Sequence, residues 1–224
     1  MLHADPGLIA HWADAWAISR GATMPVARDN GLYIHVGQPD QVGRYIFARP
    51  DAEAIRPLAA AIDQPLLYLK VCAPADTVRP LLPPGWEIAT PGYMMTAPLA
   101  VMLGELPAIP AGFVIDITRQ GGIIFAHILD ADGEEAARGR IVPVEDLLVF
   151  DRVRTAERYQ RRGLGSAIMR SLAIEADGLR IRDAMLCATP AGRALYTKLG
   201  WSLHSDYTTA SLAPCAESSV LDPQ

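Results

Sequence analysis

The fold is decided by the stretch at residues 155–166, TAERYQRRGLGS. It stands between a β-rich run at Leu147–Thr155 and a helical run at Gly165–Ala176. Glycine at such a junction adopts backbone angles that other residues resist, and it lets backbone amides approach a ligand closely. The first N–H groups of a helix have no partner inside the helix and carry a partial positive charge, which suits a diphosphate. The junction therefore predicts a pyrophosphate-binding loop.

The composition around this loop supports an anion site. Six arginines lie between positions 152 and 170 on a chain whose formal net charge is −5. Arginine binds phosphate oxygens through two N–H groups at once. The loop contains neither GxxxxGK[ST] nor GxGxxG, which excludes the P-loop and Rossmann nucleotide sites. An ordinary strand-to-helix turn with solvated arginines remains the alternative.

The rest of the C-terminal half alternates strands and helices, which predicts a mixed α/β sheet. Asp132-Gly133 is a strong hairpin sequence, and the acidic residues around it are explained by that turn better than by a calcium loop. The remaining expected strands are Phe113–Thr118, Ile123–Leu129, Ala136–Val144 and Met185–Ala188, with a helix at Pro190–Leu199 and closing strands from Trp201.

The N-terminal half contains a similar succession of elements. Helices are expected at Pro6–Arg20, after Asp51 and at Pro74–Leu82, and strands at Gly31–Val36, Gly43–Ala48 and Pro65–Val71. The proline-rich segment Leu106–Gly112 is expected to be a linker, which predicts domains at residues 1–105 and 112–224. Gly85-Trp86 and Gly200-Trp201 each follow a helix and precede a tyrosine, so the halves could be an internal repeat, with coincidence as the alternative.

Two separate motifs resemble one family. The loop at Gln160–Gly165 fits the [QR]-x-x-G-x-[GA] signature of the GCN5-related N-acetyltransferases (GNAT), and Ala188–Trp201 resembles that family's second coenzyme-contacting segment. The resemblance covers about Ile123–Thr209 and implies the GNAT acyl-CoA N-acyltransferase fold. It implies acetyl transfer from acetyl-CoA to an amine, and it says nothing about which amine.

The family's coenzyme contacts carry over by position. The resemblance implies backbone hydrogen bonds to the pantetheine arm from a strand segment, and binding of pyrophosphate by loop amides. Gln160 occupies the first position of the signature, and Thr189 stands where many members have asparagine. The implied strand residues are Val153, Arg154 and Thr155, and the implied amides are those of Arg161, Arg162, Gly163, Leu164, Gly165 and Ser166.

In this family the amine attacks the thioester directly, so it must first lose a proton. Asp151, on the strand beside the expected thioester, is the candidate general base. An ordinary aspartate has a pKa of about 4, so this role requires burial or a relaying water. An ion pair with Arg152 or Arg154 is the alternative role, and Glu145 and Asp146 are alternative bases.

Tyr196 matches the tyrosine that often protonates the departing thiolate in this family. A phenol with a pKa near 10 can donate that proton, and packing between helix and sheet is the alternative role. A module that binds acyl-CoA without turning it over, as a sensor or interaction domain, is the alternative function.

Composition limits the other expectations. The negative net charge argues against nucleic-acid binding, and no apolar run is long enough to cross a membrane. Three distant cysteines without a CxxC pair, and scattered histidines, predict a cytoplasmic protein without a disulfide or a metal site. The expected partners are acetyl-CoA and an amine acceptor, such as a small amine, an amino acid, an antibiotic or a protein, bound by a monomer or a homodimer.

One departure from the family concerns architecture. A GNAT domain normally has two helices between its first two strands, but Gln120–Gly122 leaves no room for them. We therefore expect the N-terminal half to be a degenerate GNAT-like copy that lines the acceptor side. Ala48-Arg49-Pro50-Asp51 replaces the glycine loop in that copy, so it is not expected to bind coenzyme.

Overall fold

The computed structural model describes residues 4–104 and 109–212. The expected linker, Leu106–Gly112, and the domain boundary at 105 therefore fall partly outside the described residues. The chain forms two units, and unit 2 comprises Thr96–Leu186 and Leu195–Ser202. Unit 1 takes Met1–Met95, Cys187–Ala194 and the C-terminal part from Leu203. The two units are thus not two consecutive segments of sequence.

Unit 1 is built on a mixed sheet with strand order β1-β2-β3-β4-β12, and β5 pairs with the outer part of β12. Strands β2 and β3 form an antiparallel hairpin, whereas β3 and β4 are parallel and are connected through α2. The elements are α1 (Pro6–Arg20), β1 (Val26–Arg28), β2 (Gly31–Gln38), β3 (Gln41–Phe47), α2 (Ala52–Ala61), β4 (Leu67–Val71), α3 (Ala75–Val78), η1 (Arg79–Leu81), β5 (Glu87–Ile88), the first part of β6 (Gly92–Pro98), and β12 (Ser202–Ser211).

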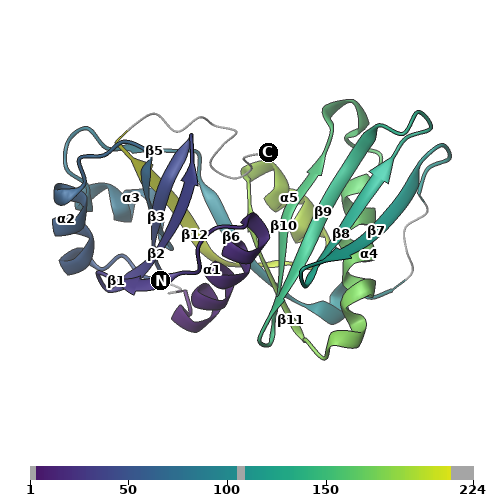
Figure 1. Ribbon diagram of the computed structural model, residues 1–224, viewed down its shortest axis with the longest axis horizontal. Helices are drawn as coiled ribbons and strands as arrows, with labels where there is room; N and C mark the ends of the chain where they lie inside the picture. Colours follow the sequence, from purple (N-terminus) through teal and green to yellow (C-terminus); the bar gives the residue numbers. More distant parts are fainter. Residues whose placement is uncertain (1–3, 105–108, 213–224) are drawn as a thin grey trace. The chain divides into compact units, whose positions relative to one another are not determined.

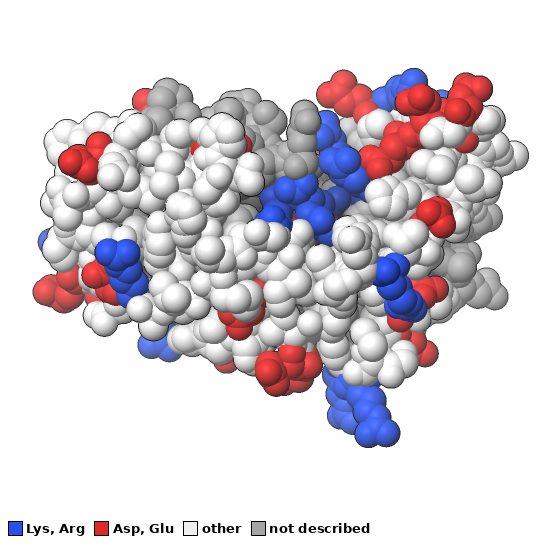
Figure 2. Space-filling model, viewed as in Figure 1, with Lys and Arg blue, Asp and Glu red and all other residues white. Residues whose placement is uncertain are grey.

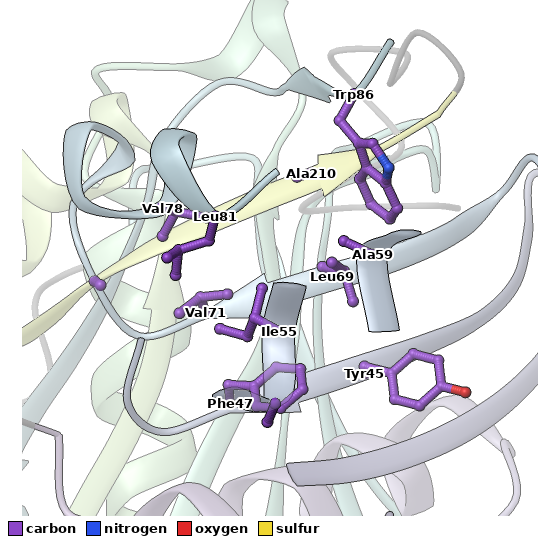
Figure 3. Packing of buried hydrophobic residues seen from close by; sticks show 12 residues of the cluster. Tyr45, Phe47, Ile55, Ala59, Leu69, Val71, Val78, Leu81, Trp86 and Ala210 are labelled. Carbon is purple, nitrogen blue, oxygen red and sulfur yellow. The ribbon is translucent and has the colours of Figure 1, made fainter. Parts of the chain in front are cut away.

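The helices of unit 1 cover both faces of this sheet. The side chains of α2, α3 and η1 pack with alternate residues of the strands, such as Phe47, Leu69 and Ala210, into one apolar core (Figure 3). Helix α1 lies on the other face, where Trp12 meets the Tyr207 ring edge-on at 5.5 Å. Arg44 stacks its guanidinium over the Trp16 ring on that face at 3.6 Å.

Unit 2 is built on a second mixed sheet with strand order β11-β10-β9-β8-β7 (Figure 1). Strands β7 to β10 form an antiparallel meander, and β10 pairs with β11 in parallel. The elements are η2 (Leu99–Val101), β7 (Val114–Gln120), β8 (Ile123–Leu129), β9 (Glu135–Val144), β10 (Leu147–Thr155), η3 (Glu157–Tyr159), α4 (Leu164–Ala176), η4 (Asp177–Leu179), the first part of β11 (Asp183–Ala188), and the second part of α5 (Pro190–Lys198).

The turn between β7 and β8 is as short as the sequence predicts. Gly121 and Gly122 have φ of 58° and 82°, which are left-handed values that favour glycine. The β7–β8 hairpin therefore closes directly, and no helix lies between these two strands.

Helix α4 packs across β8, β9 and β10. Ile168, Leu172 and Ala176, predicted to share one face of this helix, are all fully buried. Gly139 on β9 makes this approach possible, because a Cβ there would lie 2.6 Å from the Ile168 Cγ2 atom. Within the described residues, no helix is both long and apolar enough to cross a membrane.

Candidate functional site

The candidate site begins at a β-bulge in β10. Asp151 is opposite Arg140 on β9, but the next recorded pair is Arg154 with Arg138. Two residues of β10, Arg152 and Val153, thus stand against Gly139 alone, and Arg152 has a left-handed φ of 52°. Bulges bend a strand and re-aim its groups, and they are frequent beside active sites. Val153, the first of the three strand residues predicted to contact the pantetheine arm, lies in this bulge, and Arg154 and Thr155 follow it.

The parallel pairing of β10 with β11 is short. It runs from Leu147 with Asp183 to Val149 with Met185. Strand β10 itself continues to Thr155. The predicted pantetheine contacts at Val153–Thr155 therefore lie on the part of β10 that follows the residues paired with β11.

The loop after β10 is anchored to the β8–β9 turn through Tyr159. Its hydroxyl donates a hydrogen bond to the Asp130 carboxylate, and its ring meets Phe113 edge-on at 5.4 Å. This hydrogen bond is the main reason that the pKa of Asp130 lies below its usual value, and it raises the pKa of Tyr159. The guanidinium groups of Arg158 and Arg162 lie over the same ring, at 4.6 and 5.5 Å from its centre.

Asp130 also accepts backbone hydrogen bonds from Asp132 and Glu134, as an ordinary turn residue does. The turn explanation of this acidic cluster is therefore confirmed. Among the residues that the structure describes, no group of three or more His, Cys, Asp or Glu side chains is arranged to hold a metal ion.

The end of the loop presents the N-terminus of α4. Gly163 is the N-cap, with a left-handed φ of 82°, and no side chain caps this helix. A Cβ at Gly163 would meet nothing within 4 Å, so the conformation alone requires glycine there. At Gly165 a Cβ would lie 3.3 Å from Leu195 and 3.5 Å from the Thr155 hydroxyl, so there the close packing favours glycine. Gln160 reaches back across the loop, with a long hydrogen bond of 3.5 Å from its Nε2 to the Thr155 carbonyl.

Three other helices begin differently. Asp5 caps α1 and Asp51 caps α2, each through a carboxylate that accepts from two backbone N–H groups. At the start of α5, the Thr189 hydroxyl accepts from the Gly192 N–H at 3.0 Å. Thr189 belongs to unit 1, whereas the glycine loop belongs to unit 2. The α4 N-terminus is thus left with the amide groups that would suit an anion such as pyrophosphate.

Asp151 forms an ion pair, but with a partner that the sequence did not indicate. Its Oδ2 lies 3.9 Å from Nη2 of Arg140, which is opposite on β9. The two side chains are 13% and 15% exposed, so the pair is largely buried. Asp151 therefore stands beside the bulge, as a candidate base must, and it is held by a cation.

Tyr196 lies on the buried side of α5 and is 8% exposed. Its ring tilts against that of Trp201, with the centroids 6.1 Å apart, and Trp201 meets Phe150 of β10 edge-on at 5.6 Å. The preceding residue, Leu195, is the one that contacts Gly165 at the start of α4. Tyr196 is thus connected by packing both to β10 and to the loop helix.

Sequence reasoning missed a basic pocket on the sheet face of unit 2 that faces away from α4. Its volume is about 340 Å³. Figure 2 shows the Lys and Arg side chains that are visible on one face of the chain. The pocket is lined by Thr118, Gln120, Phe125, His127, Arg138, Gly139, Arg140 and Arg152.

The strand period could have revealed the two faces of this sheet, but not the pocket. Ile124, Ala126 and Ile128 alternate with Phe125 and His127 along β8, and the first three are buried. In the observed register, Phe125 is opposite Arg140 and His127 is opposite Arg138. The pattern of one strand indicates the two faces, but the register that brings the arginines beside Phe125 and His127 is visible only in the folded sheet.

Comparisons with known proteins agree with this geometry. Residues 119–203 match the family model of the acetyltransferase (GNAT) domain. No curated protein matches the sequence significantly. A GCN5-related N-acetyltransferase from Kribbella flavida has a TM-score of 0.63 at 16% identity, over 93% of this chain and 95% of that chain.

Two further solved structures are similar. A GCN5-related N-acetyltransferase-like protein from Streptococcus suis 89/1591 has a TM-score of 0.59 at 15% identity, over 92% of this chain and 97% of that one. A tandem GNAT protein from the clavulanic acid biosynthesis pathway has a TM-score of 0.52 at 13% identity, covering 73% and 69%. At these identities the likeness shows the fold, a mixed α/β GNAT fold. The family model identifies a GNAT acetyltransferase domain in residues 119–203.

Proposed function

We propose that this chain transfers an acetyl group from acetyl-CoA to an amine, by direct attack of the amine on the thioester. One observation carries the proposal. A bulged strand, β10, leads through the Gly163 loop into α4, whose N-terminus no side chain caps. Acyl-CoA donors are those that this family uses, and the conformation of the loop fits their pyrophosphate.

Different residues of the chain would contact different parts of the coenzyme. The backbone of Val153, Arg154 and Thr155 would hold the pantetheine arm beside the bulge. The amides from Arg161 to Ser166 would hold the pyrophosphate, and Gln160 braces the loop against Thr155. Arg158 and Arg162, fixed over the Tyr159 ring, add positive charge next to these amides. Thr189, in unit 1, caps α5, and its contact with the coenzyme stays a prediction.

The chemistry requires three proton transfers. Asp151 would accept the proton that the ammonium group must lose before attack, and its place beside the bulge supports this role. The amine nitrogen then bonds to the thioester carbonyl carbon and loses its second proton to solvent, and the carbon–sulfur bond breaks. Tyr196 would donate its phenolic proton to the departing thiolate and recover it from solvent.

The first test measures coenzyme binding. Acetyl-CoA at 100 times its dissociation constant should stabilise the chain by about 2.7 kcal/mol, which raises the Tm of a protein of this size by roughly 5–10 °C. In Gly163→Val the side chain enters space that the protein leaves open, so it should remove most of this rise. Titration calorimetry should show one molecule of acetyl-CoA per chain.

Gly122→Val is the matched control. Gly122 has the same φ of 82° as Gly163, and a Cβ there also meets nothing within 4 Å. Both variants therefore carry the same backbone strain, and only Gly163→Val should lose the response to acetyl-CoA. If the folded wild type shows no rise in Tm at millimolar acetyl-CoA, the coenzyme assignment is wrong.

A binding module without turnover is the second candidate function. It is favoured by the Asp151–Arg140 ion pair, since a carboxylate held by a cation is a poorer proton acceptor. Release of free CoA in the presence of a panel of amines separates the two functions. Stable binding of acetyl-CoA without release above the rate in buffer would support the module.

For the N-terminal half, we infer a degenerate GNAT-like copy. The order β2-β3-α2-β4, an antiparallel hairpin followed by a helix and a parallel strand, repeats as β9-β10-α4-β11. In the first copy the Asp51 carboxylate accepts from the Glu53 and Ala54 amides, where α4 has open N–H groups. One coenzyme site per chain is therefore expected, and a stoichiometry of two would contradict this inference.

A further inference from the structure

We propose that the basic pocket of unit 2 binds the carboxylate of the acceptor, so that the amine acetylated by this chain is a small molecule that also carries a carboxylate, of the amino-acid type. The inference rests on the proposed acetyl transfer and names the class of its acceptor. It rests on the charge, the size and the position of the pocket.

The charge of the pocket is positive. Three of its lining residues are arginines, Arg138, Arg140 and Arg152, and no Asp or Glu lines it. The acidic neighbours lie at its margin, where Glu135 accepts from Nη1 of Arg138 at 3.1 Å and Asp151 pairs with Arg140. A guanidinium has five N–H donors in a planar fork, so the pair of Arg138 with Glu135 leaves a geometry suited to a second carboxylate.

Residues at the margin of the pocket also fix the orientation of its arginine side chains. Glu135 binds both Arg138 and Nδ1 of His127, at 3.1 and 2.8 Å. Arg140 lies over the Phe125 ring, with its guanidinium carbon 5.7 Å from the ring centre. Arginines held in this way lose less freedom when they bind a ligand. Phe125 supplies the apolar contact for the body of a small acceptor.

The size and position of the pocket fit an acceptor. A volume of about 340 Å³ is at the small end of ligand pockets and suits a molecule the size of an amino acid. Arg140 is opposite Asp151 in the sheet, and Arg152 is within the bulge. A carboxylate bound here would place the rest of the molecule beside the proposed base and thioester.

The chemistry of the surrounding face supports the same conclusion. No helix lies between β7 and β8. The pocket residues on the face that points away from α4 are mostly polar or basic. A polar face with one aromatic ring is a surface for a charged small molecule rather than for a packed helix.

The test compares matched acceptors on the full chain with acetyl-CoA. The panel contains the common L-amino acids, their carboxamides, the corresponding amines without a carboxyl group, and aminoalkyl phosphates. CoA release is followed by chromatography. The best amino acid should exceed its carboxamide in kcat/KM on the order of 10- to 100-fold, the range for hydrogen bonds to a charged group. Most of the difference should appear in KM.

Arg138→Gln should bring the ratio of the two acceptors toward one without changing the affinity for acetyl-CoA. Arg119→Gln is the control, because it removes the same charge from β7, outside the pocket, where Arg119 pairs with Glu175. It should leave the ratio unchanged. Equal rates for amino acids and carboxamides, or a preference for aminoalkyl phosphates, would overturn the carboxylate assignment.

Two further outcomes separate the pocket from the coenzyme site. If Arg138→Gln weakens acetyl-CoA binding tenfold or more, the pocket belongs to the coenzyme and the proposal fails. If the wild type does not bind acetyl-CoA, the proposed function has failed, and amino-acid binding is then measured alone by the rise in Tm. A rise with amino acids but not with carboxamides, abolished in Arg138→Gln, would still support the pocket, and no rise would refute it.

Discussion

Gly139→Ala is the substitution that most directly tests how the sheet of unit 2 supports the site. The added Cβ would lie 2.6 Å from Cγ2 of Ile168 and 3.1 Å from Cγ2 of Val153. Ile168 is fully buried and β-branched on a helix, so its methyl group has little freedom to move. Forcing a methyl group into such a core costs about 1–3 kcal/mol. The loss of glycine's freedom in the unfolded chain returns about 0.4–1 kcal/mol.

Gly178→Ala is the matched control for this experiment. A Cβ at Gly178 meets nothing within 4 Å, and its φ is not left-handed. It carries the same unfolded-state term without the clash, so it should be neutral or stabilising. The free energies of unfolding of the two variants should therefore differ by about 1–3 kcal/mol in urea titrations. That difference corresponds to roughly 2–12 °C in Tm for a chain of this size.

A second-site change identifies the contact responsible. Ile168→Leu keeps the side-chain volume but removes the Cγ2 branch, at a cost usually below about 1.5 kcal/mol. In that background Gly139→Ala should lose most of its penalty, since the closest contact is gone. Because Val153 is the next closest contact and lies in the bulge, Gly139→Ala alone should also weaken acetyl-CoA binding. If Gly139→Ala is as stable as Gly178→Ala, the close packing of α4 on β9 is wrong.

Two further predictions concern the tyrosines of the site. Tyr196→Phe should keep the affinity for acetyl-CoA but slow acetyl transfer by roughly 10²–10⁴-fold, since it removes the proposed proton donor and keeps the ring; an unchanged rate in single-turnover measurements would assign Tyr196 to packing against Trp201 alone. Tyr159→Phe should remove the hydrogen bond that lowers the pKa of Asp130. A lowered carboxyl pKa contributes stability above about pH 4 that is lost as the pH falls further, so the wild type should exceed Tyr159→Phe in stability at neutral pH and converge with it in acid. Parallel curves at all pH values would show that the Tyr159–Asp130 contact contributes nothing.

Much of the secondary structure could be predicted from the sequence because the local patterns are strong. The strand at Ile123–Leu129 and the helix at Pro6–Arg20 have the predicted bounds, and the hairpin from Gly31 and the α4 helix differ only at their ends. The starts of α1 and α2 could be predicted because the carboxylates of Asp5 and Asp51 cap these helices. The glycine loop could be recognised because the backbone conformation and the binding of an anion both require glycine and free amide groups within a few adjacent residues.

The features that could not be predicted from the sequence depend on pairing between distant strands. The sequence offered Arg152 and Arg154 as alternative partners for Asp151, and Arg140 could not be foreseen because it lies opposite only through the pairing of β9 with β10. The pocket arginines come from β9 and β10, and Phe125 and His127 come from β8, so only the register places them together. The return of the C-terminal strand β12 to pair with β4 in unit 1 is of the same kind. Hydrophobic patterns indicate which side of a strand is buried but not which strand lies beside it.

The two loops that follow the two hairpins show how one local arrangement can either bind an anion or need none. Every helix N-terminus offers amide N–H groups and a partial positive charge that some acceptor must satisfy. At α2 the acceptor is the chain's own carboxylate on Asp51, which bonds the Glu53 and Ala54 amides. At α4 the cap is Gly163, which has no side chain and has a left-handed φ of 82°. Exchanging a carboxylate for a glycine thus converts a satisfied helix end into one that an external anion can satisfy. We infer that this difference at one position in each half explains why only the C-terminal copy would hold the coenzyme.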